Sequence, residues 1–90
     1  MNKVCRHYKI TGKVQGVFYR RGTQQKAWEL ELTGRVFNVG DGSVEVVACG
    51  DVENLEQLEE WLWEGPPRAQ VEEVVSWDVP FKHFTDFLVG

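Results

Sequence analysis

The first third of the 90-residue chain lacks acidic residues altogether. Residues 1–28 hold seven Lys and Arg and no Asp or Glu, whereas the rest of the chain holds three cations and all fourteen acids. The formal net charge of −4 argues against indiscriminate nucleic-acid binding, because domains with that role are usually basic. The acid-free third is instead compatible with a local site for an anionic ligand.

Long apolar runs and cysteine motifs are also missing. No run approaches the roughly 18 residues that a membrane-spanning helix needs, and the N-terminal sequence Met-Asn-Lys-Val-Cys-Arg-His lacks the apolar stretch of a signal peptide. The two cysteines form neither a CxxC motif nor a disulfide framework. We therefore expect a cytoplasmic monomer in which residues 1–90 form a single domain, with no membrane partner.

Hydrophobic periodicity and turn signals predict the order of the secondary-structure elements. The pattern predicts, in order, a strand (4–11), a helix (23–32), two strands (35–39 and 43–49), a helix (52–64) and two strands (71–79 and 84–89). Gly40-Asp41-Gly42 is typical of a hairpin turn. Gly34 is expected to end the first helix, and Asp51 to cap the second. The order predicts an α+β fold of the ferredoxin-like split β-α-β type, with an antiparallel sheet and both helices on one face.

A glycine-rich segment, Gly12-Lys-Val-Gln-Gly-Val-Phe-Tyr-Arg20, joins the first strand to the first helix. Glycine allows backbone amides to converge on a ligand, and the N-terminus of the following helix adds further unpaired amides. A guanidinium such as that of Arg20 fits phosphate oxygens in a two-pronged geometry. The segment therefore suggests a phosphate cradle, although glycine-rich turns before helices are often only structural.

Two segments of the chain resemble the signatures of the acylphosphatase family. The segment from Gly12 to Arg20 resembles the first, and Gly34-Arg-Val-Phe-Asn-Val-Gly-Asp-Gly-Ser-Val44 resembles the second. The likeness extends over nearly the whole chain, including Thr85-Asp86-Phe87. Two departures are small: Tyr19 stands where phenylalanine is common in the family, and Arg35 where tryptophan is frequent.

The resemblance implies hydrolysis of acyl phosphates to a carboxylate and inorganic phosphate, without metal or cofactor. It assigns Arg20 to the phosphoryl group and Asn38 to the orientation of the attacking water. The expected partners are a small-molecule acyl phosphate and, as competing anions, phosphate or sulfate. The phosphate-binding residues that it implies, through their backbone amides, are Gln15, Gly16, Val17, Phe18, Tyr19 and Arg20.

Two other functions have the same predicted topology. One is a non-catalytic module that holds acyl or carbamoyl phosphate. The other is an RNA-recognition domain, which would need exposed aromatic side chains on the central strands of the sheet. Tyr8 is assigned to the core face, and the third strand has no aromatic residue. The sequence therefore favours no nucleic-acid partner.

The split β-α-β arrangement makes the first and third strands antiparallel neighbours. A register that pairs Cys5 with Cys49 also places Lys9 opposite Glu45, an opposite-charge pair. Both thiols then lie on the face without helices, close enough to form a disulfide. A reduced pair in the cytoplasm is the alternative. His7 shares that face and completes a conceivable three-ligand cluster, but three candidates in an assumed register do not indicate a metal site.

Overall fold

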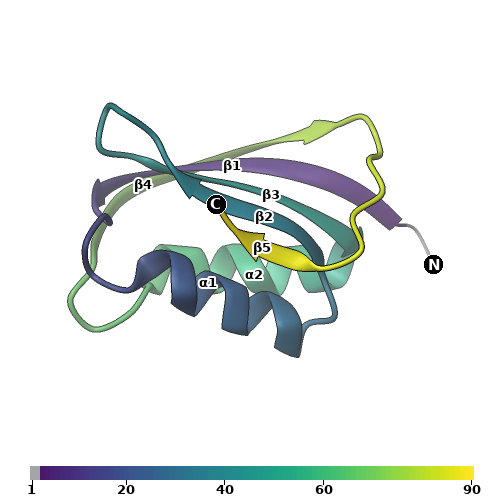
Figure 1. Cartoon of the computed structure of the whole chain (residues 1–90), viewed down its shortest axis with the longest axis horizontal. Helices are drawn as coiled ribbons and strands as arrows, with labels where there is room; N and C mark the ends of the chain where they lie inside the picture. The colour runs from purple at the N-terminus through teal and green to yellow at the C-terminus, as the bar shows by residue number, and fades with distance from the viewer. Residues whose placement is uncertain (1–2) are drawn as a thin grey trace.

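The chain forms one five-stranded sheet with two helices packed on a single face, as Figure 1 shows for the computed structural model. The structure describes residues 3–90. The strand order across the sheet is β4-β1-β3-β2-β5. The elements are, in chain order, β1 (Lys3–Lys13), α1 (Tyr19–Glu29), β2 (Thr33–Asn38), β3 (Val44–Asp51), α2 (Val52–Glu64), β4 (Gln70–Val79) and β5 (Phe87–Val89). This is the predicted ferredoxin-like α+β layout.

The alternating residues of the central strands build the core against the two helices. Tyr8 and Ile10 of β1 and Val46 of β3 are completely buried on the helix-facing side of the sheet. They meet the apolar stripe of α2, formed by Leu55, Leu58 and Leu62. Burial of three such leucines contributes about 1.5–3 kcal/mol each relative to exposure. Strand alternation and helix amphipathicity therefore bury the same core, as the sequence predicts.

The sheet is mixed, and the prediction of a fully antiparallel sheet is wrong at one edge. β5 pairs in parallel with β2, from Gly34↔Phe87 to Val36↔Val89, while the other pairings are antiparallel. β4 and β5 lie at opposite edges of the sheet, so the chain must cross from one edge to the other before β5 can pair with β2. Residues 80–86 provide this connection, as Figure 1 shows.

Helix α1 begins four residues earlier than predicted, at Tyr19, and ends earlier, at Glu29. It can begin there because Phe18 takes a left-handed conformation and its carbonyl accepts a hydrogen bond from the amide of Gly22 at 3.0 Å. Propensity favours the later start because it gives weight to the helix-forming residues after Gly22. The helix therefore starts directly at the end of the glycine-rich segment.

Gly34 does not end the first helix, contrary to the prediction. The chain turns at Glu31, which has a φ of 57°, and Gly34 lies inside β2. A Cβ at Gly34 would lie only 1.8 Å from the carbonyl oxygen of Val47 on the neighbouring strand, so a side chain cannot be accommodated. The glycine is therefore required by close strand packing.

Helix α2 has the predicted bounds, but Asp51 does not cap it through its side chain. Asp51 occupies the N-cap position, makes no side-chain capping bond, and its buried Oδ1 has no hydrogen-bond partner within residues 3–90. β3 continues to Asp51, so strand pairing with Lys3 fixes its backbone. The sheet geometry takes precedence over the local capping preference here.

The register of β1 and β3 pairs Cys5 with Cys49 and Lys9 with Glu45. The two cysteines are joined by a disulfide, with their Cα atoms 4.0 Å apart. They lie on the face of the sheet without helices and are nonetheless buried. The backbone of Lys82 covers them, since its amide lies 3.3 Å from the sulfur of Cys5. The connection to β5 therefore packs directly on the disulfide.

We expect reduction of the disulfide to lower the free energy of unfolding by about 4 kcal/mol, because the bond closes a long loop in the unfolded chain. The sequence separation of the two cysteines is 44 residues. Urea unfolding with and without dithiothreitol measures the difference. A Cys5→Ala/Cys49→Ala variant is the control and should not respond to the reductant. An equal midpoint for the parent under both conditions would contradict the expectation.

Candidate functional site

The loop between β1 and α1 is held by buried side chains on one side and open on the other. Val14 and Val17 are buried in the core, whereas Gly16 between them is exposed. Gly16 has a φ of 74°, and a Cβ placed there would meet no atom within 4 Å. Glycine is thus needed for the backbone conformation rather than for lack of space. The result is a fixed loop whose open side is accessible to a ligand.

Arg20 lies in the first turn of α1, directly after this loop. Its Nη1 donates a hydrogen bond of 2.9 Å to the backbone oxygen of Gly90. A guanidinium has five N–H donors, so this bond leaves others for a ligand. The first turn of α1 contains no acidic residue, and the unpaired amides at a helix N-terminus carry a partial positive charge. The local field at Arg20 therefore favours an anion.

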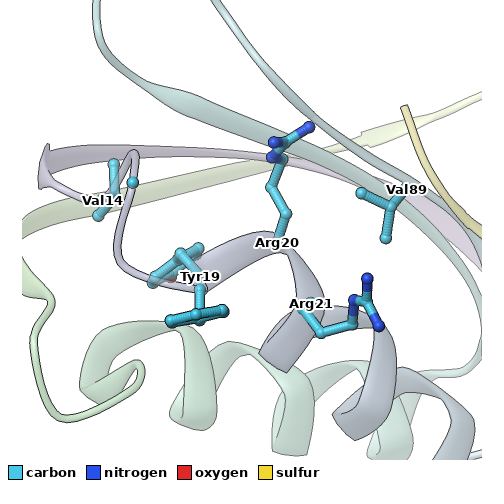
Figure 2. A pocket seen from close by; sticks show the side chains of 7 residues that line it. Val14, Tyr19, Arg20, Arg21 and Val89 are labelled. Carbon is cyan, nitrogen blue, oxygen red and sulfur yellow. The ribbon is translucent and has the colours of Figure 1, made fainter.

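A cavity of about 490 Å³ lies over this first turn (Figure 2). Figure 2 shows the side chains of Arg20 and Arg21 rising from α1 on the side where Val89 of β5 lies. Four of the predicted site residues line the cavity: Gly16, Phe18, Tyr19 and Arg20. The other lining residues are Val14, Arg21 and Val89.

Three predicted site residues, Gln15, Val17 and Asn38, do not line this cavity. Val17 is buried, so only its backbone can serve a ligand. The structure adds three lining residues that the sequence analysis did not assign, Val14, Arg21 and Val89. The position of Arg21 beside Arg20 in the first helical turn was a usable signal. Val89 had none, because its place depends on the parallel pairing of β5.

The side chain of Gln15 connects the loop to the turn between β2 and β3. Its Nε2 donates to the carbonyl of Val39 at 2.8 Å and to that of Ser43 at 2.9 Å. An amide nitrogen has two N–H groups, so one side chain satisfies both carbonyls. The sequence analysis assigned only the backbone amide of Gln15 and missed this contact. The contact fixes the loop relative to the strand that ends at Asn38.

Asn38 is the last residue of β2 and is exposed. Its side chain makes no hydrogen bond with any part of the chain from residue 3 onward. The next residue, Val39, accepts the bond from Gln15. Two residues before Asn38, the carbonyl of Val36 accepts a 2.8 Å hydrogen bond from the amide of Gly90, the residue that also contacts Arg20. Both contacts connect the end of β2 to the loop and to Arg20.

Several cations of the acid-free segment are paired with acids on other elements. Arg6 forms an ion pair with Asp78 at 2.8 Å, and Lys9 pairs with Asp41 at 3.0 Å and with its strand neighbour Glu45 at 4.0 Å. Within residues 3–90, Arg20 and Arg21 form no ion pair with an Asp or Glu side chain. No Asp or Glu side chain among the described residues therefore offsets the positive charge of these two guanidinium groups.

The carboxylate of Asp41 holds the β2–β3 turn through hydrogen bonds and an ion pair. Asp41 Oδ1 accepts hydrogen bonds from the hydroxyl of Ser43 at 2.6 Å and from its amide at 2.9 Å. These bonds, together with the ammonium of Lys9, hold the pKa of Asp41 well below its usual range. The carboxylate stays ionised at neutral pH and keeps the turn closed. Ser43 in turn presents its carbonyl to Gln15.

The side chains considered for a metal are otherwise engaged. His7 Nε2 lies 2.6 Å from Glu45 Oε1, and the imidazole stacks on Trp77 with 4.7 Å between ring centroids. Cys5 and Cys49 form the disulfide. No group of three or more His, Cys, Asp or Glu side chains in the described part of the chain is arranged to hold a metal ion. None of its helices is both long and apolar enough to cross a membrane.

The chain is similar to known proteins in both sequence and structure. The sequence model of the acylphosphatase family matches residues 6–89. An acylphosphatase from Marinobacter nauticus is 54% identical over 82 residues, which are 90% of this chain and 89% of that protein. The structure of an acylphosphatase from Coxiella burnetii superposes with a TM-score of 0.96 at 47% identity, covering 99% of this chain and 94% of that one.

A longer protein contains the same fold. The crystal structure of full-length HypF in its phosphate- and nucleotide-bound form matches with a TM-score of 0.87 and 25% identity, over 99% of this chain and 12% of that one. The family match, the full-length relatives and the shared fold lead to one conclusion. The chain belongs to the acylphosphatase family, enzymes that hydrolyse acyl phosphates.

Proposed function

We propose that this chain hydrolyses the carboxyl–phosphate bond of acyl phosphates, with the phosphoryl group held by the Arg20 guanidinium and the backbone amides of residues 15–20. The observation that carries the proposal is Arg20, which has no Asp or Glu partner within residues 3–90 and lines a cavity at the N-terminus of α1 beside the exposed Gly16. Phosphoryl transfer passes through a loose transition state with charge on the phosphoryl oxygens. Fixed donors around these oxygens supply most of the rate enhancement.

In the proposed reaction, the amide side chain of Asn38 orients a water molecule toward phosphorus. The water oxygen forms the new P–O bond, and the bond between phosphorus and the acyl oxygen breaks with its electron pair remaining on the carboxylate. The phosphate accepts the proton that the water loses. The free side chain of Asn38, at the strand end connected by Gln15 to the loop, supports this role.

The proposed reaction uses no metal and no cofactor. A carboxylate is a good leaving group, so no general acid is needed. The guanidinium groups of Arg20 and Arg21 and the N-terminus of α1 supply the positive charge that phosphoryl oxygens require. Phosphate and sulfate should bind the same cradle as competitive inhibitors. The phosphate-bound state of HypF, a protein with this fold, is consistent with such a ligand.

A non-catalytic module that only holds acyl or carbamoyl phosphate is the alternative, since the same cradle could bind without turnover. Release of inorganic phosphate from benzoyl phosphate, in buffer containing EDTA, separates the two functions. Turnover by the purified chain above the spontaneous rate supports the proposal. Saturable binding of the acyl phosphate without phosphate release would establish the binding module instead.

We expect Arg20→Ala to lower kcat/KM for benzoyl phosphate by at least about tenfold, because charge-assisted bonds are worth roughly 1.5–3 kcal/mol and a bidentate contact gathers two. Inhibition by inorganic phosphate should weaken in parallel. Steady-state kinetics of phosphate release measure both effects. Lys13→Ala is the matched control, since Lys13 is an exposed cation of the same segment that does not line the cavity. An equal loss in both variants would assign the effect to general charge.

We expect Asn38→Ala to lower kcat strongly while KM and the inhibition constant of phosphate change little. The reason is that a residue that positions water acts in the transition state and does not hold the ground-state phosphoryl group. Asn54→Ala on α2 is the control for loss of a partly exposed asparagine elsewhere. Hydrolysis of benzoyl phosphate by Asn38→Ala at the parent rate would rule out the water-positioning role.

A further inference from the structure

Phe18 is an anomaly at the edge of the cavity. Its side chain is 78% exposed, while its neighbours Val17 and Tyr19 are almost completely buried. Its backbone is left-handed, with a φ of 64° and a ψ of 22°. Among residues 3–90, the only other non-glycine residue with a positive φ is Glu31, which is polar and exposed at a helix end. An exposed aromatic side chain in this conformation needs an explanation.

Stability does not explain a phenylalanine at this position. A bulky residue with a positive φ is a backbone outlier, and such outliers cluster at functional sites. The exposed ring contributes little hydrophobic stabilisation, because that contribution comes from burial. Phe18 is also the N-cap of α1 and makes no side-chain capping bond, whereas Asn, Asp, Ser and Thr are the preferred residues at N-caps. A short polar residue would suit the fold better.

The ring of Phe18 lies where it can contact a ligand bound in the cavity. Phe18 lines it together with Arg20 and Val89. At about 30 Å³ for each heavy atom, the share of a water molecule, the four heavy atoms of a phosphoryl group take on the order of 120 Å³. The cavity measures about 490 Å³. A phosphoryl group held by Arg20 thus leaves room for an acyl group, and the half-exposed Val89 adds a second apolar side chain to the lining.

We propose that the ring of Phe18 forms an apolar wall that binds the acyl part of the substrate, so that the enzyme prefers acyl phosphates with aromatic or bulky apolar acyl groups over short ones. The inference rests on the proposed function and refines its substrate class. Aromatic rings attract one another in offset or edge-to-face contacts beyond their burial of surface. The contact is made equally in the ground state and the transition state, so it should act mainly on KM.

The test compares benzoyl phosphate with acetyl phosphate in the parent, Phe18→Asn and Phe18→Tyr. Asparagine tolerates a left-handed backbone, so Phe18→Asn removes the ring without opposing the loop conformation. The measured quantity is the ratio of kcat/KM for benzoyl phosphate to that for acetyl phosphate. Each variant is compared with the parent on the same substrates, which cancels the difference in their intrinsic reactivity.

We expect Phe18→Asn to lower this ratio by about fivefold, mostly through a higher KM for benzoyl phosphate. Phe18→Tyr, which keeps a ring, should stay within about twofold of the parent. Phe81→Asn is the matched control, because Phe81 is also an exposed phenylalanine, at 59%, and does not line the cavity. Its ratio should equal that of the parent.

A parent-like ratio in Phe18→Asn, or an equal fall in Phe81→Asn, would overturn the inference. Phe18→Gly, which also accepts a φ of 64° without strain, carries the same expectation and takes the place of Phe18→Asn if that variant does not fold. Failure of the proposed function has a different signature: the parent would then hydrolyse neither acetyl phosphate nor benzoyl phosphate.

Discussion

The proposed site depends on a loop that buried side chains hold in place. Backbone amides stabilise a developing charge only when they already point at it, since reorganisation during the reaction would cancel the gain. Val14 and Val17 anchor the loop in the core. Tyr19 anchors its end, because the buried hydroxyl donates to the carbonyl of Leu62 at 2.5 Å and burial raises the pKa of this phenol well above its usual value. The loop is thus a fixed extension of the core.

The absence of acidic residues from the first third of the chain favours an anion at this loop, although the protein as a whole is acidic. Two of the four cations of β1, Arg6 and Lys9, are paired with acids of β3, β4 and the β2–β3 turn. These ion pairs are at least partly exposed and contribute little stability individually. Their effect is on the potential, since they offset charge on β1, whereas Arg20 and Arg21 at the first turn of α1 have no Asp or Glu partner within residues 3–90. An anionic substrate is therefore attracted to one end of a molecule whose net charge would repel it.

Patterns local to one element predicted most of the fold. The amphipathic α2 and the β2–β3 hairpin are determined by residues within one or two consecutive elements, and the pairing of Cys5 with Cys49 was predicted from the split β-α-β topology that the order of elements indicates. The failures have tertiary causes. The left-handed Phe18 starts α1 early, and no propensity scale predicts such a residue. The parallel pairing of β5 depends on the path of residues 80–86 across the sheet.

The same distinction applies to the site. Glycine and arginine in the loop are visible in the sequence because their chemistry is local. Gln15 was assigned through its backbone alone, since its side-chain partners, Val39 and Ser43, lie on a turn distant in sequence. The contribution of β5 was invisible for the same reason. The residues proposed to bind the ligand were therefore easier to identify in the sequence than the contacts that hold them in place.

The short strand β5 lies between two features of the molecule. Its C-terminal end leads to the contact with Arg20, and the connection before it packs on the disulfide. The parallel pairing of β5 with β2 brings Gly90 to the carbonyl of Val36 and to the guanidinium of Arg20. The buried ring of Phe87 and the bond from Gln24 Nε2 to its carbonyl, at 2.8 Å, hold the strand against α1. At the other end, the connection that leads into β5 packs its Lys82 backbone on the disulfide. The orientation of Arg20 is therefore set by Gly90, the residue that follows β5, as well as by its own helix. A short edge strand thus contributes to the site although it makes up only three residues of the sheet.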